Sequence, residues 1–201
     1  MNELVIVGAG GHALVCAEIA QLTGWRVTAF CVDAGFAHGH ELNGIRVTTS
    51  VDKADAIFVA IGDNASRRRH FSTHQQRGMK LPHLIHPAAI LSPTAVIDAG
   101  TVLMAGAIVC ANTKIGKFCI LNTACTVDHE CQVEDGAQIG PGVHIAGNVT
   151  VGADAFIGIG ASVIPKIRIG AAATVGAGSV VLRDIQPGAK VMGIPARQSD
   201  R

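Results

Sequence analysis

The sequence predicts two parts: a Rossmann-like α/β half-domain over residues 1–83 and a parallel β-helix over residues 84–201. Two observations lead to this prediction. Apolar strands alternate with helical segments in the first part, whereas the second part carries an aliphatic residue at every sixth position. The composition agrees, because 24 glycines suit many tight turns and an aromatic content of 3% leaves the core to Ile, Val, Leu and Ala.

The first part reads as a βαβαβ half-domain. Residues 3–7 are an apolar strand, and a glycine turn then leads into a helix that ends at Gly24. Residues 26–33, with the sequence RVTAFCVD, predict a second strand with an acidic residue at its end. A third strand over residues 55–64 is followed by a polar helix over residues 65–78. Such elements are typical of half of a Rossmann-like fold.

The second part is defined by a strict six-residue period. Seventeen consecutive positions at this spacing hold only Ile, Leu or Val, a pattern that neither a helical period of about 3.6 nor a strand period of about 2 produces. A hexapeptide repeat is typical of a parallel β-helix, in which six residues form one flat side and three sides form one coil. The repeated positions are Ile85, Leu91, Ile97, Leu103, Val109, Ile115, Leu121, Val127, Val133, Ile139, Ile145, Val151, Ile157, Val163, Ile169, Val175 and Val181.

A second set of positions, four residues after each aliphatic one, holds mostly small residues that fit beside a tight corner. Cys119, Cys125 and Cys131 belong to this set, and we interpret them as small buried apolar residues. A catalytic cysteine among them is the alternative, because a thiol nucleophile would form an acyl-enzyme. The residues after the last repeat are expected to cap the open end of the β-helix.

Charge and composition narrow the classes of partner. Sixteen basic and fifteen acidic residues nearly cancel, so nothing in the composition indicates a nucleic-acid partner. No segment approaches the roughly 20 apolar residues of a membrane span, and the N-terminus lacks the basic region of a signal peptide. We therefore expect a cytoplasmic protein whose six cysteines are reduced. Their spacing, without a C-x-x-C pair, argues against a zinc site.

The turn after the first strand, GAGGHA at residues 8–13, fits the pattern G-x-G-x-x-A of phosphate-binding loops at helix N-termini. His12 stands at the helix start, where it can hydrogen-bond a ligand phosphate or sugar, or act as a capping or surface residue. Asp33, 25 residues after the first glycine of the motif, is placed to reach a ribose. The short half-domain favours a mononucleotide or a nucleotide-sugar over a complete NAD site. A capping domain without a ligand is the alternative.

Polar residues also follow the third predicted strand. Asp63 and Asn64 lie where the carboxyl end of a parallel strand borders a ligand crevice, although both are equally suited to cap the next helix. Arg67, Arg68 and Arg69 form the one basic cluster of the sequence, which indicates either a phosphate contact or a solvated helix face.

One histidine of the repeat region is placed for chemistry. Asp128, His129 and Glu130 occupy a corner just after the aliphatic Val127, within a stretch of otherwise small and aliphatic residues. The two carboxylates can hold and orient the imidazole, and imidazole is a good general base near neutral pH. Asn122 adds another polar group, which we expect one rung of the repeat earlier. We therefore interpret His129 as a general base, with a surface histidine as the alternative.

Four segments resemble the bacterial sugar acetyltransferases of the PglD/NeuD type. They are VGAGGHALVCAEIA, FVAIGDNASRR, LIHPAAILSPTAVI and ILNTACTVDHECQV, and the resemblance covers essentially the whole chain. The family includes N-acetyltransferases of nucleotide-linked 4-amino sugars and O-acetyltransferases of sialic acid. The repeats resemble the left-handed β-helix of hexapeptide acyltransferases, which are typically homotrimers, and the tail VMGIPAR resembles the ending of many such enzymes.

The resemblance implies roles for individual residues. His129 would be the general base, Glu130 its hydrogen-bonded orienter, and Asn122 a residue that helps to hold the catalytic region. Gly147 would offer its backbone N–H to the thioester carbonyl of acetyl-CoA. The residues that would face the nucleotide-sugar are Gly10, Gly11, His12, Asp33, Asp63, Asn64 and Arg67. The residues that would border acetyl-CoA are Ile159 and Ala177, in a groove between neighbouring subunits, and Gln138, near the acetyl group.

Two positions depart from the family pattern. Gln138 stands nine residues after His129, where close family members carry a second histidine, and glutamine can donate a hydrogen bond but cannot titrate. The second predicted strand ends in CVDAG, where relatives often have paired aspartates, so only Asp33 remains for nucleotide recognition.

The resemblance and the residues together predict an acetyl-CoA-dependent N-acetyltransferase that needs no metal and serves bacterial glycan biosynthesis. Its acceptor is expected to be the 4-amino group of a nucleotide-linked amino-deoxy sugar, with UDP as the leading nucleotide. GDP-perosamine and a sialic-acid hydroxyl are alternative acceptors. Two other classes stay open: a metal-dependent hydratase, which would use His86, His129 and His144, and a trimer that senses a nucleotide-sugar without catalysis.

Overall fold

The computed structural model describes residues 2–33, 41–51 and 54–199. The chain separates into two compact units, Met1–Pro87 and Ala88–Arg201. The boundary expected between residues 83 and 84 lies just before this division. Neither described helix, α1 (Gly11–Leu22) nor α2 (Asn64–Gln76), has the length and apolar character needed to cross a membrane.

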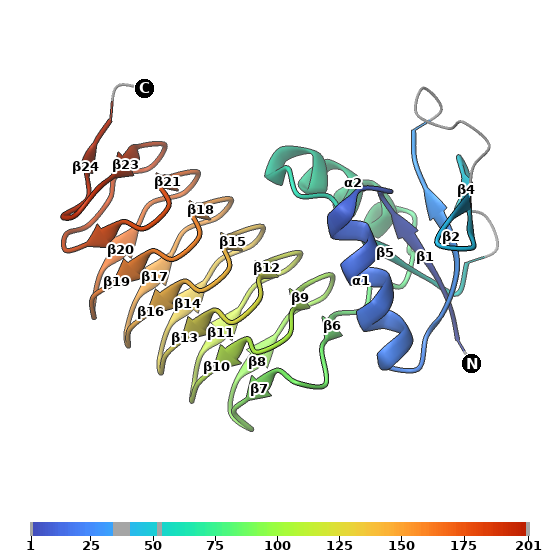
Figure 1. The fold of residues 1–201 in the computed structure, drawn as a ribbon, viewed down its shortest axis with the longest axis horizontal. Coiled ribbons are helices and arrows are strands. Elements are labelled where there is room, and N and C mark those ends of the chain that lie inside the picture. The colour runs from blue at the N-terminus through green and yellow to red at the C-terminus, as the bar shows by residue number, and fades with distance from the viewer. Residues whose placement is uncertain (1, 34–40, 52–53, 200–201) are drawn as a thin grey trace. The chain divides into compact units, whose positions relative to one another are not determined.

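The first unit is built on a mostly parallel sheet (Figure 1). Its strands are β1 (Glu3–Val7), β2 (Arg26–Cys31), β3 (Glu41–Leu42), β4 (Ile45–Thr48) and β5 (Ala56–Val59). The strand order is β3-β4-β2-β1-β5, and β1 pairs in parallel with both β2 and β5. β4 pairs in parallel with β2, whereas β3 pairs antiparallel with β4.

Burial explains why the central strands read as continuous apolar runs. Leu4, Ile6 and Ile57 are each 0% exposed, as expected for parallel strands that are covered on both faces. The chain leaves β1 through Gly8, which has a φ of +118°. A Cβ atom at this position would lie 2.6 Å from the carbonyl oxygen of Ala60, so only glycine fits this turn.

The order of elements differs from the predicted βαβαβ in one respect. α1 joins β1 to β2 and α2 follows β5, both as expected, but the second crossover of a βαβαβ unit is replaced, since the described residues between β2 and β5 contain the β3–β4 pair. Asn43 and Gly44 join that pair, with φ values of 51° and 74°. An Asn-Gly step with two positive φ angles is the strongest short-range hairpin signal, and the sequence interpretation overlooked it.

The second part of the fold is a parallel β-solenoid of two-residue strands, which confirms the prediction from the six-residue period (Figure 1). Its strands are β6 (Leu84–Ile85), β7 (Ile90–Leu91), β8 (Val96–Ile97), β9 (Val102–Leu103), β10 (Ile108–Val109), β11 (Lys114–Ile115), β12 (Ile120–Leu121), β13 (Thr126–Val127), β14 (Gln132–Val133), β15 (Gln138–Ile139), β16 (His144–Ile145), β17 (Thr150–Val151), β18 (Phe156–Ile157), β19 (Ser162–Val163), β20 (Arg168–Ile169), β21 (Thr174–Val175) and β22 (Val180–Val181).

Away from the two ends of the solenoid, each strand pairs with the third strand before it and the third strand after it. β13, for example, pairs in parallel with β10 and β16, which aligns Thr126 with Ile108 and with His144. Residues 18 positions apart are therefore vertical neighbours, and residues 6 positions apart lie on different faces. The three sheets have the orders β22-β19-β16-β13-β10-β7, β20-β17-β14-β11-β8 and β24-β23-β21-β18-β15-β12-β9-β6.

The repeated aliphatic residues fill the interior of the coils. Leu121, Val127 and Ile139 are each 0% exposed, and the small residues Cys119 and Ala137 beside them are also 0% exposed. The interpretation of Cys119, Cys125 and Cys131 as small buried residues is confirmed, since they are 0%, 0% and 2% exposed. The narrow coil has room for one large side chain per hexad and a small one near each corner.

The chain forms two further strands after β22, and they lie at one end of the eight-stranded sheet. β23 (Lys190–Met192) pairs in parallel with β21, and β24 (Arg197–Gln198) turns back to pair antiparallel with β23. This reversal interrupts the parallel stacking at one end of the sheet, where an open ladder would otherwise be available to another strand.

Candidate active site

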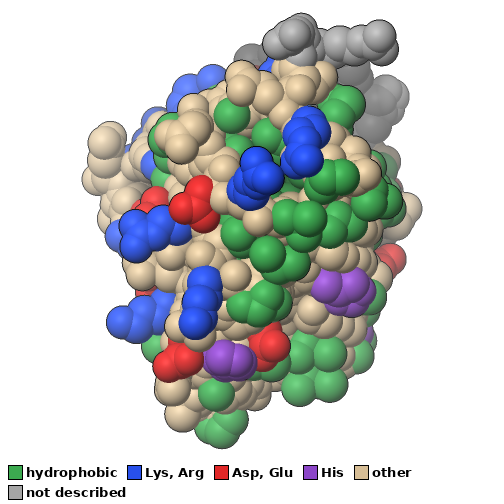
Figure 2. All heavy atoms as spheres, turned by 90° about the vertical axis from the view of Figure 1, so that its left-hand side faces the viewer, with side chains coloured by type: hydrophobic (Ala, Val, Ile, Leu, Met, Phe, Trp, Pro, Cys, Tyr) green, Lys and Arg blue, Asp and Glu red, His purple; other side chains and the backbone are tan. Residues whose placement is uncertain are grey.

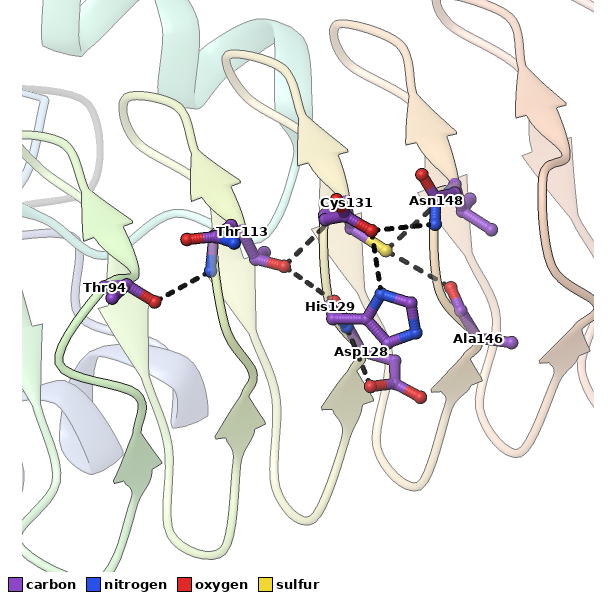
Figure 3. A network of polar contacts seen from close by, with 10 residues as sticks. Thr94, Thr113, Asp128, His129, Cys131, Ala146 and Asn148 are labelled. Carbon is purple, nitrogen blue, oxygen red and sulfur yellow. Dashed lines mark hydrogen bonds and ion pairs between the residues drawn. The ribbon is translucent and has the colours of Figure 1, made fainter.

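His129 lies at the corner that follows β13, and its side chain is 53% exposed. The Nδ1 atom lies 3.1 Å from Oε2 of Glu130, so the carboxylate accepts a hydrogen bond from Nδ1–H (Figure 3). This contact fixes the tautomer in which Nε2 carries a lone pair. His129 therefore presents a proton acceptor at the surface of the corner, held by Glu130 as expected.

Among the described residues, Glu130 and not Asp128 forms the hydrogen bond to the imidazole, which corrects the expectation that both carboxylates hold it. Oδ1 of Asp128 instead accepts a hydrogen bond of 2.7 Å from the backbone N–H of His129. The difference arises because consecutive residues of the corner point in different directions. Asp128 stabilises the backbone of the corner, while Glu130 reaches the ring.

Asn148 completes the corner, and the sequence interpretation missed it. Its Nδ2 donates to Oε2 of Glu130 over 3.2 Å, and its backbone N–H donates to the carbonyl oxygen of His129 over 2.9 Å (Figure 3). A signal existed, because Asn148 follows Glu130 by 18 residues, which is one full coil. Glu130 and Asn148 both have positive φ values, of 56° and 60°. The same corner position has a positive φ in other hexads, at Asn112, Phe118 and Asp154 for example, so this conformation belongs to the turn of the repeat.

Gly147 lies directly against the imidazole. A Cβ atom on Gly147 would lie 2.5 Å from Nε2 of His129 and 2.6 Å from its Cε1, so a glycine is required for the ring to occupy this position. No described residue accepts a hydrogen bond from the Gly147 N–H. The corner therefore combines a proton acceptor and an uncommitted backbone donor next to each other, which is the pair of groups that acyl transfer requires.

Asn122 lies elsewhere, which corrects the expectation that it precedes His129 by one rung. It follows β12 in the eight-stranded sheet, whereas His129 follows β13 in the six-stranded sheet. Its Oδ1 accepts a hydrogen bond of 2.8 Å from the N–H of Thr123. The reason is geometric: one hexad moves the chain to the next face, and a vertical neighbour is reached only after three hexads.

Three of the four residues expected beside acetyl-CoA, all except Gly147, share the sheet of Asn122. Gln138 lies in β15, Ile159 follows β18, and Ala177 follows β21, so all three belong to the eight-stranded sheet and its corner. Within one chain, the structure places them in the same sheet as Asn122 and in a different sheet from the strand that precedes His129. Ile159 is 57% exposed and apolar, which suits contact with another molecule.

The cysteines next to the corner are buried thiols. Cys125 is 0% exposed and Cys131 is 2% exposed. Burial raises the pKa of Cys125 to about 12, and burial also raises the pKa of Cys131. Because the thiolate is the nucleophile, these environments favour direct transfer over the alternative with an acyl-cysteine.

A metal-dependent hydratase would need histidines of the solenoid as metal ligands. Nδ1 of His144 lies 2.9 Å from the hydroxyl oxygen of Thr126, one coil earlier. Within residues 2–33, 41–51 and 54–199, no three or more His, Cys, Asp and Glu side chains are arranged to hold a metal ion.

The first unit contains a cavity of about 820 Å³ at the carboxyl ends of β1 and β2. Gly10 and Asp33 line it, as expected for residues that face a nucleotide. A Cβ atom on Gly10 or on Gly11 would meet no atom within 4 Å. The protein itself does not require these two glycines, and the space above them is available for a ligand to approach the backbone.

His12 is neutral and largely enclosed. Burial, and secondly the nearby Arg67, lower its pKa to about 4. Its Nε2 lies 3.7 Å from the Sγ atom of Cys16, one helical turn later. His12 does not line the cavity, so its expected contact with a phosphate or sugar stays a prediction.

Arg67, Asp63 and Asn64 shape the loop before α2 rather than line the cavity. Arg67 is 1% exposed, and its Nη1 donates to the carbonyl oxygens of Ile61 and Gly62, each over 2.9 Å. Its Nη2 donates to Oδ1 of Asn64 over 2.7 Å. Asp63 caps α2, because its Oδ1 accepts a hydrogen bond of 2.8 Å from the N–H of Ser66. Their direct contact with a ligand stays a prediction.

One face of α2 lines the cavity, and the sequence interpretation missed it apart from Arg69 of the basic cluster. The lining residues are Ser66, Arg69, His70, Thr73 and His74 of α2 and its C-cap residue Arg77, at the three- and four-residue spacing of a helix face. Nε2 of His70 lies 3.9 Å from Oδ2 of Asp33 across the cavity. The polar helix was predicted, but the regular spacing of its basic residues was the overlooked signal.

The C-terminal coils expose apolar side chains. Figure 2 views the molecule from the side on which these coils lie and shows hydrophobic side chains at the surface among Lys and Arg. The large apolar residues exposed in this part of the chain are Phe156, Ile159, Ile164, Leu182, Met192 and Ile194. Such exposure is typical of a surface that contacts another molecule.

Known proteins share both the family signatures and the fold. The family model of the PglD N-terminal domain matches residues 3–73, and that of the bacterial transferase hexapeptide (six repeats) matches residues 130–161. A histidine-to-asparagine mutant of perosamine N-acetyltransferase from Caulobacter crescentus, in complex with CoA and GDP-perosamine, is 35% identical. The match covers 100% of this chain and 98% of that chain, with a TM-score of 0.95.

Two further solved structures agree. The acetyltransferase domain of PglB from Neisseria gonorrhoeae, in complex with acetyl coenzyme A, is 36% identical, with a TM-score of 0.91 over 99% of this chain and 100% of that chain. WeeI from Acinetobacter baumannii is 26% identical, with a TM-score of 0.89 over the same shares of the two chains. The corner motif, the glycine loop and these full-length matches together show that the chain belongs to the PglD-type family of bacterial sugar acetyltransferases.

Proposed function

We propose that this protein transfers the acetyl group of acetyl-CoA to the amino group of a nucleotide-linked amino-deoxy sugar. The observation that carries the proposal is the contact between Nε2 of His129 and the Gly147 peptide, with Nδ1 held by Glu130. Relatives support the cosubstrate and the acceptor class, since one holds CoA and GDP-perosamine and another holds acetyl coenzyme A.

The proposed reaction is a direct transfer. The amine nitrogen of the sugar attacks the thioester carbonyl carbon, and His129 Nε2 takes the proton that the amine loses. The carbonyl oxygen becomes an oxyanion, which accepts a hydrogen bond from the Gly147 N–H, a donor worth about 3 kcal/mol in such sites. The carbon–sulfur bond then breaks, and the CoA thiolate takes the proton from the imidazolium. The products are the acetamido sugar and CoA.

The acceptor is proposed to bind in the cavity of the first unit. Gly10 offers close backbone approach to a phosphate, Asp33 lies where a ribose would be bound, and Arg69 and Arg77 supply positive charge. UDP and GDP are both candidate nucleotides. The relative with GDP-perosamine supports GDP, and a UDP-linked 4-amino sugar is the other acceptor to test.

We infer that the active enzyme is a homotrimer. In one chain, Gln138, Ile159 and Ala177 belong to the eight-stranded sheet and the corner after it, not to the corner of His129, so a neighbouring copy is needed to bring acetyl-CoA to the base. The exposed apolar residues of the C-terminal coils suit such an interface. Native mass measurement is expected to give three times the 20.7 kDa of one chain. Both substrates are cytoplasmic metabolites, so the reaction belongs in the cytoplasm, where its product would supply a glycosyltransferase of glycan biosynthesis.

A mass-spectrometric assay tests the proposal. Acetyl-CoA is offered with a UDP-4-amino sugar, GDP-perosamine or sialic acid, and the acetylated product is detected directly because the six protein thiols would disturb a thiol-based assay. One acetyl group added to a nucleotide amino sugar supports the proposal. Acetylation of sialic acid alone would overturn the proposed acceptor, and no transfer would favour a sensing trimer. The variant His129→Ala is expected to lose about 10²- to 10⁴-fold in kcat, and full activity would remove His129 as the base.

A further inference from the structure

A ladder of polar side chains runs inside the coils beneath the His129 corner (Figure 3). Thr113 donates its hydroxyl to the carbonyl oxygen of Asp128 over 2.6 Å and accepts the N–H of Cys131 over 3.1 Å. Cys131 repeats the pattern one coil later, because its Sγ–H donates to the carbonyl oxygen of Ala146 over 3.2 Å and its Sγ accepts the N–H of Val149 over 3.4 Å. The two interior side chains thus donate to the carbonyls of the residues that directly precede His129 and Gly147.

The contact between Cys131 and Ala146 has a consequence for Gly147. The Ala146 carbonyl and the Gly147 N–H belong to one planar trans peptide, in which the two groups point in opposite directions. The carbonyl is held toward the interior by the thiol, so the N–H points outward. Outward is where Nε2 of His129 lies, as the 2.5 Å approach to a Gly147 Cβ position shows. Among the described residues, Cys131 is the only donor to the Ala146 carbonyl.

We propose that Cys131 is a positioning residue for acetyl transfer: its thiol proton, donated to the Ala146 carbonyl, orients and polarises the Gly147 N–H that stabilises the oxyanion. This inference rests on the proposed function of the corner. A hydrogen bond at the carbonyl end of a peptide strengthens the N–H end as a donor, since chained hydrogen bonds polarise one another. The role requires a protonated thiol, and the burial of Cys131 keeps it protonated.

The chain contains a matched control for this role. Cys119 occupies the same interior position at another corner, is 0% exposed, and donates its Sγ–H to the carbonyl oxygen of Glu134 over 3.1 Å. Its N–H donates to the hydroxyl of Thr101 over 2.9 Å, as that of Cys131 does to Thr113. Cys119→Ala therefore removes the same volume and the same kind of hydrogen bond at a corner that lacks the base.

The first measurement reports the peptide itself and needs no substrate. The sequence contains six Ala-Gly steps, so protein labelled with ¹³C at alanine carbonyls and ¹⁵N at glycine gives one carbonyl–amide correlation for each step. The Ala146–Gly147 signal is identified by its loss in Ala146→Ser. We expect Cys131→Ala to shift this signal, Cys119→Ala to leave it unchanged, and Cys131→Ser to keep it near its original position, because the serine hydroxyl also donates.

The second measurement is steady-state acetyl transfer. Deleting an oxyanion donor costs about 10²- to 10³-fold, and a donor that is only misdirected costs less, so Cys131→Ala is expected to lower kcat about tenfold. The KM for the acceptor sugar is expected to stay unchanged. The kcat of Cys119→Ala is expected to stay within about twofold of the wild type, because the Cys119 thiol does not contact the Ala146–Gly147 peptide. Cys131→Ser is expected to recover most of the lost kcat, because its hydroxyl can donate to the Ala146 carbonyl in place of the thiol.

The outcomes separate this inference from the proposed function. An unshifted Ala146–Gly147 signal, or equal kcat values for Cys131→Ala and Cys119→Ala, would overturn the positioning role while leaving the acetyltransferase intact. An acetyl adduct on Cys131 would replace it with a nucleophilic role. If the wild type acetylates no acceptor, the proposed function fails, and the carbonyl shift by itself decides whether the thiol orients the peptide.

Discussion

Gly147→Ala is expected to damage catalysis without unfolding the protein. The added Cβ would lie 2.5 Å from Nε2 of His129, and ordinary contact begins at 3.4 Å, so the ring has to move by about 1 Å. A displacement of about 1 Å of a catalytic group costs up to about 10²-fold in rate. The backbone itself tolerates alanine, because Ala153, Ala171 and Ala177 occupy the same place in other hexads. The ring, with 53% of its side chain exposed, can swing into solvent at little cost in stability.

The assay combines kinetics with thermal unfolding. We expect Gly147→Ala to lower kcat about 10²-fold and to change Tm by only a few degrees. The variant His129→Ala removes the group that the new Cβ meets, so adding Gly147→Ala to it should have no further effect on kcat. Wild-type kcat in Gly147→Ala would refute the placement of the imidazole against this peptide. Additive losses in the double variant would show that Gly147 acts independently of His129.

Three further predictions follow from the two units. Asn148→Gly keeps the left-handed backbone and removes the donor to Glu130, so kcat should fall about fivefold in steady-state assays; an unchanged kcat would mean that the carboxylate needs no second partner. His12 is neutral when folded, with a pKa lowered to about 4, and protonates near 6.5 when unfolded. The free energy of unfolding should therefore be level above pH 6.5 and fall by up to about 3 kcal/mol between pH 6.5 and 4, as urea titrations can measure; an equal slope in His12→Gln would contradict this. Arg67→Met leaves two carbonyls of the loop before α2 without their donor and should cost about 3 kcal/mol in thermal unfolding, unlike Arg68→Met as the control; similar Tm values for both variants would argue against the anchoring role.

The solenoid could be predicted from the sequence because the six-residue pattern that produces it is local and repeated. An aliphatic residue every six positions and a small residue four places later fix each side and each corner, and every hexad repeats the same constraint. The first unit was less regular. Its buried parallel strands and the helix after the third strand were predicted from apolar and polar runs, but the hairpin at Asn43 and Gly44 depended on turn chemistry that was overlooked.

The candidate site divides in the same way. His129, Glu130 and Gly147 were identified from the motif and its family resemblance, and the structure brings these three together. Asn148 and the basic face of α2 were not identified, because each is defined by a spacing (18 residues in the solenoid, three and four in the helix) rather than by a motif. Asn122 was expected one rung below His129 but lies on a different face of the coil, because each hexad of the sequence moves the chain to the next face.

By itself, the sequence determined the period of the solenoid, the glycine loop after β1 and the residue types of the catalytic corner, because each is encoded within a few consecutive residues. Tertiary structure alone decided which of these residues meet. Vertical stacking brings Asn148 and Gly147 to His129 from one coil later, and it directs the Cys131 thiol to the Ala146 carbonyl. Burial, likewise, is a property of the packed fold, and it makes Arg67 a loop anchor and keeps His12 neutral. The contacts and the desolvation of a residue depend on the groups that surround it in space. Its neighbours in the sequence do not determine either of them.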